Sequence, residues 1–295
     1  MTNYIGAHDP REAERLAAQE SGALAELRAA LALHAPPPGV RVLELGCGTG
    51  VYTRALLDAL PGANVIGIDR DRELLARARE NLAAEIAAGR VTLLEGDVAR
   101  LPFDARDFGL VTCRCVLMHQ PEPELVVAEM FRVAETGGIG LAIEPDWSAR
   151  ALYPDAEAYA ELLALARRAR PHGFPDLLLG RKLYALFRAA GFGSIRAAAT
   201  AFAETASAGT PGGRPLAAGA SKEEVEELVG PARLLEQGRA LIRGAGLATD
   251  AELDALIARL SSMRRHPEYF SGGADFAVSG IKPAATIIGE GERFA

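Results

Sequence analysis

Three glycines at alternate positions follow an apolar run in the segment VLELGCGTG, residues 42–50. The run is rich in valine and leucine, so residues 40–45 are predicted to form a buried strand that ends where the glycines begin. Glycine lets the main chain turn tightly and lets a ligand approach its N–H groups, because no Cβ stands in the way. The segment therefore predicts a turn against which a nucleotide-like ligand binds.

Two acidic residues lie where the next two strands are expected to end. Asp69 closes the run VIGID, a position from which a carboxylate can accept hydrogen bonds from both ribose hydroxyls of a nucleoside. Asp97, in LLEGDVARLPF, is placed to accept from an adenine amino group, with a helix cap as the alternative. The glycines read G-x-G-x-G rather than G-x-G-x-x-G, which argues against a nicotinamide-dependent oxidoreductase.

Strands and helices are expected to alternate around these residues. Apolar runs and caps predict strands near 40–45, 63–69, 91–96, 108–114 and 138–144, and helices near 50–60, 71–88 and 122–134. Such alternation predicts a parallel sheet with helices on both faces, an α/β fold. The carboxyl ends of its strands would bring the glycine turn and the two acids together.

The flanking regions are expected to be mostly helical. Before the sheet, a capped helix is predicted from Pro10 to about Leu33. After it come predicted helices at 155–169, 180–190, 222–243 (kinked at Pro231) and 250–262, a small-residue loop at 205–220, and strands at 194–200 and 276–282.

With these motifs in order, the segment from Val40 to Glu144 resembles the class I S-adenosylmethionine (SAM)-dependent methyltransferases. ELGCGTG, VIGIDRD, EGDVARLPF and EMFRVAETGGIGLAIEP are similar to their successive motifs, and DFGLVTCRCVLMHQPEP is similar to the small-molecule branch that includes ubiquinone and menaquinone methyltransferases. The resemblance implies a Rossmann-like, doubly wound, seven-stranded, mostly parallel sheet. It also implies a helical N-terminal segment and a helical insertion or lid between the late strands.

The resemblance further implies SAM as cofactor and assigns residues to it. The methionine part would lie against Glu44, Gly46 and Gly48, with Cys47 in the same motif, and would be bordered by Arg114. Asp69 would hold the ribose, Arg70 would lie beside the adenine, and Asp97 with the Val98 amide would bind the adenine edge. A surface ion pair is the alternative role for Arg114.

The methyl acceptor is expected beyond the fourth and fifth strands. Methyl transfer from a sulfonium is an in-line displacement that needs alignment and exclusion of water rather than a covalent nucleophile. We expect four residues around the acceptor: His119, Asp146, Trp147 and Tyr153. His119 is the candidate general base, with ordering of its loop as the alternative, and Asp146 is the second catalytic candidate. Trp147 suits a flat or apolar acceptor, with packing under a helix as the alternative.

The N-terminal stretch is expected to fold over the cofactor, as in similar small-molecule enzymes. Tyr4 and Arg15 are the candidates for closing the site, and packing of this stretch on the sheet edge is the alternative. The predicted division is 1–38 for this segment, 39–147 for the SAM-binding core, and 148–295 for acceptor-side helices and strands that complete the same domain.

The composition of the chain limits the kinds of molecule that it is expected to bind. A formal net charge of -7 disfavours nucleic acid, and the sequence contains no apolar run long enough to span a membrane, so a cytoplasmic location is expected. Cys47, Cys113 and Cys115 indicate no disulfide framework, and no metal-ligand spacing is seen. The sequence leaves a homodimer open. It favours an enzyme that methylates an oxygen, nitrogen or carbon of a small metabolite, with a catalytically inactive SAM-binding protein as the alternative.

Overall fold

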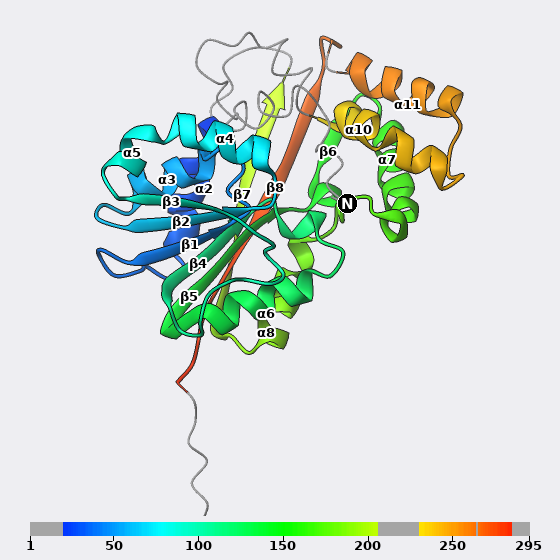
Figure 1. Cartoon of the computed structure of the whole chain (residues 1–295). Helices are drawn as coiled ribbons and strands as arrows, with labels where there is room; N and C mark the ends of the chain where they lie inside the picture. Colours follow the sequence, from blue (N-terminus) through cyan, green and yellow to red (C-terminus); the bar gives the residue numbers. More distant parts are fainter. Residues whose placement is uncertain (1–19, 206–229, 264, 285–295) are drawn as a thin grey trace, which may run out of the picture.

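The computed structural model describes residues 20–205, 230–263 and 265–284 of the chain (Figure 1). Its centre is an eight-stranded sheet, and the strand order is β3-β2-β1-β4-β5-β8-β6, with β7 paired to β8. The α/β fold class is therefore confirmed, with one strand more than the seven expected. The predicted domain boundaries stay predictions.

Five parallel strands form the first part of the sheet. They are β1 (Arg41–Leu45), β2 (Asn64–Asp69), β3 (Val91–Glu95), β4 (Phe108–Arg114) and β5 (Ala134–Pro145). Each follows an apolar run of the sequence, and β1 and β4 are buried along nearly their whole length because helices cover both faces. The chain passes from β1 to β2 on one side and later to β4 on the other. This reversal makes the carboxyl ends of β1 and β4 a topological switch point, which is where α/β proteins bind ligands.

Three antiparallel strands complete the sheet. The long strand β8 (Phe270–Ile281) pairs with β5 on one side and with β7 (Gly193–Thr205) on the other. The short β6 (Ala151–Tyr153) continues the β5 side of β8, opposite residues 270–272. Both β7 and β8 extend beyond the ranges predicted for them. The start of β8 reads FSGGAD, which has weak strand propensity, and hydrogen bonding to β7 stabilises it as a strand.

Helices cover both faces of the sheet. One face carries α2 (Glu20–Leu31) and α3 (Val51–Ala59), whose apolar residues share a buried cluster with β1 and β2. The other face carries α6 (Pro123–Val133) and α8 (Leu183–Ala190) (Figure 1). The helix expected at 71–88 is two helices, α4 (Arg72–Asn81) and α5 (Ala83–Ala87), because the chain leaves helical geometry at Leu82.

Three further helices form the expected insertion between late strands. They are α7 (Ala156–Ala169), α10 (Pro231–Gly244) and α11 (Asp250–Met263), and they lie together beside β6 (Figure 1). The expected kink at Pro231 is instead the start of α10, because Gly230 has φ +145°, which no helix contains. Residues 222–229 of that expected helix lie outside the described residues.

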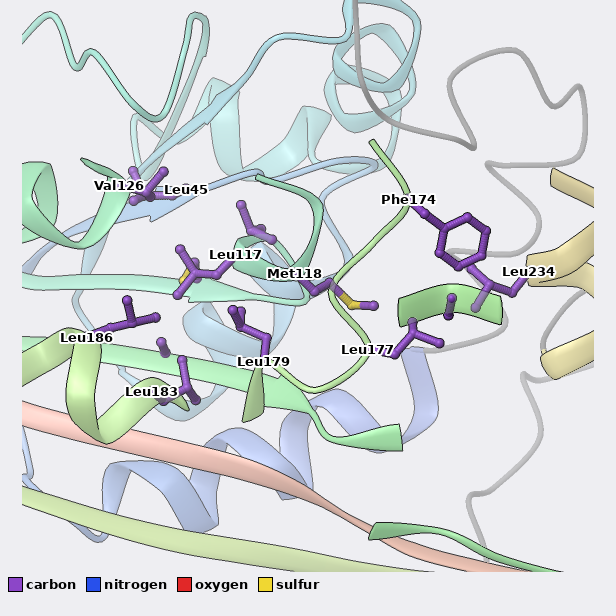
Figure 2. Close-up of a cluster of buried hydrophobic side chains, with 14 of the residues drawn as sticks. Leu45, Leu117, Met118, Val126, Phe174, Leu177, Leu179, Leu183, Leu186 and Leu234 are labelled. Atoms are coloured by element: carbon purple, nitrogen blue, oxygen red, sulfur yellow. The ribbon is translucent and has the colours of Figure 1, made fainter. Parts of the chain in front are cut away.

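A continuous apolar cluster joins the sheet to this insertion. Figure 2 shows it running from Leu45 of β1 through Leu117 and Met118 to Leu234 of α10. The segment between α7 and α8 supplies its centre, with Phe174, Leu177 and Leu179 buried. The insertion is therefore held against the carboxyl edge of the sheet by ordinary core packing. Within the described residues, no helix combines the length and the apolar character that crossing a membrane requires.

Candidate functional site

Two parts of the carboxyl edge carry the predicted site residues. We call the residues at and after the carboxyl ends of β1, β2 and β3 the cofactor edge, namely 44–50, 69–71 and 97–98. We call the residues at and after the carboxyl ends of β4 and β5 the acceptor edge, namely 114–119 and 144–153.

The glycine turn begins the cofactor edge. Gly46, Gly48 and Gly50 all have positive φ, at 67°, 53° and 85°, which residues with a Cβ rarely adopt. The Gly46 N–H donates to the carbonyl oxygen of Ile68 over 2.7 Å, so the turn is fastened to the end of β2. The expected tight turn is therefore present, and its glycines are required by the backbone conformation.

Asp69 connects this turn to the next helix. Its Oδ2 accepts from the Gly48 N–H at 2.8 Å, and its Oδ1 accepts from the Asp71 N–H at 3.0 Å. Burial raises the pKa of Asp69 above its ordinary value, although these backbone N–H groups act in the opposite direction. Each carboxylate oxygen has two acceptor positions, so both oxygens keep one for a ligand hydroxyl.

Glu44 lies beneath the turn, fully buried within β1. Its Oε2 accepts from the Thr53 hydroxyl at 2.6 Å, while its Oε1 is buried with no hydrogen-bond partner among the described residues. Burial raises the pKa of Glu44 to about 8. A buried carboxylate oxygen without a partner is costly, and a cationic ligand group at the turn would satisfy it.

The residues expected at the adenine lie at the same edge. Arg70 directly follows Asp69, and Val98 is buried after β3. Asp97 is exposed, and its Oδ1 accepts from the Ala99 N–H at 2.9 Å. This local turn holds the loop after β3 and leaves the other carboxylate oxygen of Asp97 without a hydrogen bond to any described residue. Cys47 is buried under the turn, where burial raises the pKa of its thiol.

Arg114 begins the acceptor edge in a buried ion pair. Its Nε donates to Oε2 of Glu26, from α2, at 2.6 Å, and the two side chains are only 7% and 8% exposed. Burial alone would lower the pKa of Arg114, but the charge of Glu26 holds it above its ordinary value. The pair is internal, so the alternative of a surface ion pair is wrong. The sequence carried a signal for Glu26: it shares one helical stripe with Ala23, Leu27 and Ala30.

Glu144, which sequence reasoning did not single out, organises the loop after β4. Its Oε1 accepts from the N–H groups of Val116 and Leu117, both at 2.7 Å, and Oε2 accepts from Met118 at 3.4 Å. Burial raises the pKa of Glu144 to about 7, against the effect of these N–H groups. The carboxylate thereby holds the 3-10 helix Leu117–His119. An acid inside the apolar run IGLAIEP was the available signal.

The two catalytic candidates sit on neighbouring loops. His119 ends that 3-10 helix and is partly buried. Asp146 is buried, and its oxygens accept from Arg181 at 2.5 and 3.0 Å and from the Ser148 hydroxyl at 2.8 Å. Burial alone would raise the pKa of Asp146, but the hydrogen bonds from Arg181 and Ser148 hold it below the ordinary value. The Asp146 carboxylate thus holds Arg181 against the loop after β5. This contact favours a positioning role for Asp146.

The aromatic candidates differ in exposure. Trp147 is partly buried and packs on the apolar cluster, and the guanidinium of Arg150 lies 4.6 Å from its ring centroid. Tyr153, on β6, is 51% exposed, and its hydroxyl donates to Glu268 over 3.4 Å. Trp147 therefore remains a wall candidate, whereas Tyr153 lies at the outer surface of β6.

Several predictions fall outside the described residues or stay untested. Tyr4 and Arg15 lie outside them, as do residues 206–220 of the predicted loop. Among the described residues, no group of three or more histidine, cysteine or acidic side chains could hold a metal ion.

Comparisons with known proteins agree with this geometry. A family model described as a methyltransferase domain matches residues 37–191. The demethylmenaquinone methyltransferase of Lactococcus lactis subsp. lactis is 31% identical over 173 residues, which cover 53% of this chain and 67% of that protein. An uncharacterized methyltransferase of Schizosaccharomyces pombe is 30% identical over 138 residues, which cover 45% of this chain and 50% of that protein. The chain spans about half the length of the first curated relatives it matches.

A solved structure shows the same fold. It is phosphoethanolamine N-methyltransferase 2 of Haemonchus contortus in complex with S-adenosyl-L-methionine, with a TM-score of 0.54 and 16% sequence identity. The match covers 96% of this chain and 60% of that one.

Proposed function

The chain belongs to the methyltransferase domain family, and from this premise we propose that it transfers the methyl group of SAM to a small-molecule acceptor. The observation that carries the proposal is the buried Oε1 of Glu44, which has no hydrogen-bond partner in the described residues and lies beneath the glycine turn. The α-ammonium of a methionine moiety is a group that would satisfy it.

The rest of the cofactor edge fits the same ligand. Asp69 keeps one acceptor position on each oxygen for the ribose hydroxyls, beside a turn whose glycines leave the backbone open. Arg70, Asp97 and the Val98 amide follow in the order that an adenine would require. Residues from three successive strand ends thus match the three parts of one nucleoside sulfonium.

When bound, SAM supplies a methyl carbon made electrophilic by the sulfonium. The protein then has to hold the acceptor in line and keep water out. Glu144 supports this by fixing the loop that carries His119, and the Asp146–Arg181 pair fixes the loop that carries Trp147. The helices α7, α10 and α11 lie beside β6 of this edge (Figure 1), where we expect them to cover the acceptor.

The acceptor edge best suits a flat, largely apolar small molecule as methyl acceptor. Trp147 offers a ring beside the carboxyl end of β5, and the Lactococcus lactis relative is named for a quinone-type acceptor. His119 is the group proposed to take a proton from the acceptor, because an imidazole titrates near neutrality. Closure by Tyr4 and Arg15, and a homodimer, remain predictions.

Calorimetric titration with SAM and an assay for S-adenosylhomocysteine release with a panel of phenols, quinols, amines and carbon acids test the proposal together. We expect saturable SAM binding and turnover with at least one flat acceptor. Binding without turnover across all four acceptor classes favours the inactive SAM-binding alternative. Absence of SAM binding overturns the proposal.

A further inference from the structure

The guanidinium of Arg150 lies over two aromatic rings at the acceptor edge. Its guanidinium carbon lies 4.6 Å from the ring centroid of Trp147 and 5.0 Å from that of Phe202, on β7. Gly273 of β8 leaves room for its stem, since an added Cβ there would come within 2.7 Å of the Arg150 Cγ. Residues from three strands or loops thus hold this side chain in one place.

Arg150 makes no ion pair within residues 20–205, 230–263 and 265–284. None of its nitrogens makes a side-chain hydrogen bond or ion pair there, and its Nε is buried without an acceptor. Asp146, four residues earlier, is committed to Arg181 at 2.5 Å. A buried charged donor without an acceptor is unfavourable, and such groups usually have a ligand or a function to explain them.

A second stacked arginine shows what a structural role looks like in this chain. The Arg41 guanidinium lies 4.8 Å from the Phe108 ring centroid, and it also pairs with the Asp107 carboxylate at 3.2 Å. Arg41 thus stacks on an aromatic ring and still has a carboxylate partner. Arg150 differs from Arg41 in its place at the carboxyl edge and in its lack of an acid.

We propose that Arg150 binds a carboxylate of the methyl acceptor, an inference that rests on the proposed function. The guanidinium carbon lies over both the Trp147 and the Phe202 ring, and a guanidinium that contacts rings through its faces keeps its N–H groups for hydrogen bonds within its plane. This is the orientation that binds a carboxylate through two parallel hydrogen bonds. The two rings favour an aromatic or conjugated body attached to that carboxylate. The flat acceptor of the proposed function would thus carry a carboxylate on its aromatic or conjugated body.

Benzoate is the probe for this site, and benzamide, of nearly the same shape but neutral, is its control. Trp147 is the only tryptophan of the chain, so its fluorescence reports directly on the ring beside Arg150. Full-length protein saturated with S-adenosylhomocysteine is titrated with each probe. We expect a saturable response to benzoate that weakens about tenfold or more in Arg150→Met, because the charged donors are lost while the apolar stem remains.

Arg41→Met is the matched control, and benzoate should bind it as it binds the wild type. Benzamide should bind wild type and Arg150→Met alike. Arg150→Lys, which keeps the charge but not the planar fork, should also weaken benzoate binding, and it decides the matter if the methionine variant does not fold. No saturable response of the wild type to tens of millimolar benzoate, or equal benzoate affinity in wild type and the folded Arg150 variants, overturns the proposal. Calorimetric titration with SAM distinguishes failure of the Arg150 proposal from failure of the proposed function, because SAM still binds when only the carboxylate site is absent.

Discussion

At the cofactor edge, Asp69 accepts from Gly48, 21 residues earlier, and from Asp71, two residues later. At the acceptor edge, Arg114 is held by Glu26 across 88 residues, and Asp146 is held by Arg181 across 35. The first edge is built from backbone turns and nearby residues, whereas the second depends on buried charges from distant segments. Changes at the cofactor edge should therefore act mainly on SAM affinity, and changes at the acceptor edge mainly on stability and turnover.

The largest expected effect is on the Glu26–Arg114 pair. Glu26→Ala should lower the free energy of unfolding by about 3–5 kcal/mol, because it leaves the guanidinium of Arg114 buried without its partner. Urea unfolding of the ligand-free protein measures this. The double variant Glu26→Leu with Arg114→Met should recover most of the loss, since it removes both charges. A wild-type unfolding midpoint in Glu26→Ala would mean that the pair does not stabilise the acceptor edge.

Asp69→Ala should act on binding rather than on the global fold. It removes charge-assisted hydrogen bonds worth about 1.5–3 kcal/mol, which is roughly a 10- to 200-fold loss of SAM affinity. Part of this loss would come from the turn itself, since Asp69 also holds the Gly48 N–H. Titration calorimetry measures the affinity, and Asp71→Ala, which removes the cap of α4 and keeps the backbone N–H that donates to Asp69, is the matched control. Unchanged SAM affinity would remove Asp69 from the site.

Glu44→Gln should reduce the dependence of stability on pH. Burial raises the pKa of Glu44 to about 8 in the folded protein, above its unfolded value, so the folded state binds more protons between these values. Stability therefore falls as pH rises through this window. Between about pH 5.5 and 8.5 the wild type should lose about 1–3 kcal/mol more than the variant. Glu124→Gln, an exposed change of the same charge, controls for net charge, and equal pH profiles in Glu44→Gln and the wild type would contradict the expectation.

The smallest expected effect is at His119. His119→Ala should lower turnover with a true acceptor at least about tenfold while leaving SAM affinity unchanged, if the acceptor must lose a proton during transfer. The pH dependence of kcat between about pH 6 and 9 is the measurement, because an imidazole base titrates there. A variant with the wild-type pH profile would assign catalysis to alignment and exclusion of water. Asp146→Asn would then test the positioning role of the loop after β5.

Local pattern predicted the first part of the sheet well and the later part less well. The strands β1 to β5 lie within a few residues of their predicted ranges, because each is an apolar run bounded by turn residues. β6 escaped prediction, because three residues carry no periodicity and pair only with residues 270–272, more than a hundred positions away. The break at Leu82 and the helix start at Pro231 were misjudged for a different reason, since helical periodicity continues through both.

The sequence by itself determined the cofactor edge of this protein, because the glycine turn, Asp69 and Asp97 each sit at the end of their own strand. A parallel sheet necessarily brings such ends together. Only the tertiary structure decided the acceptor edge. Whether Glu26, Glu144 or Asp146 is a free acid or a buried partner depends on which distant donor faces it, and local sequence does not encode that. The same holds for Arg150: its two rings come from different strands or loops, and its lack of an ion pair with any described residue is visible only when its neighbours are in place.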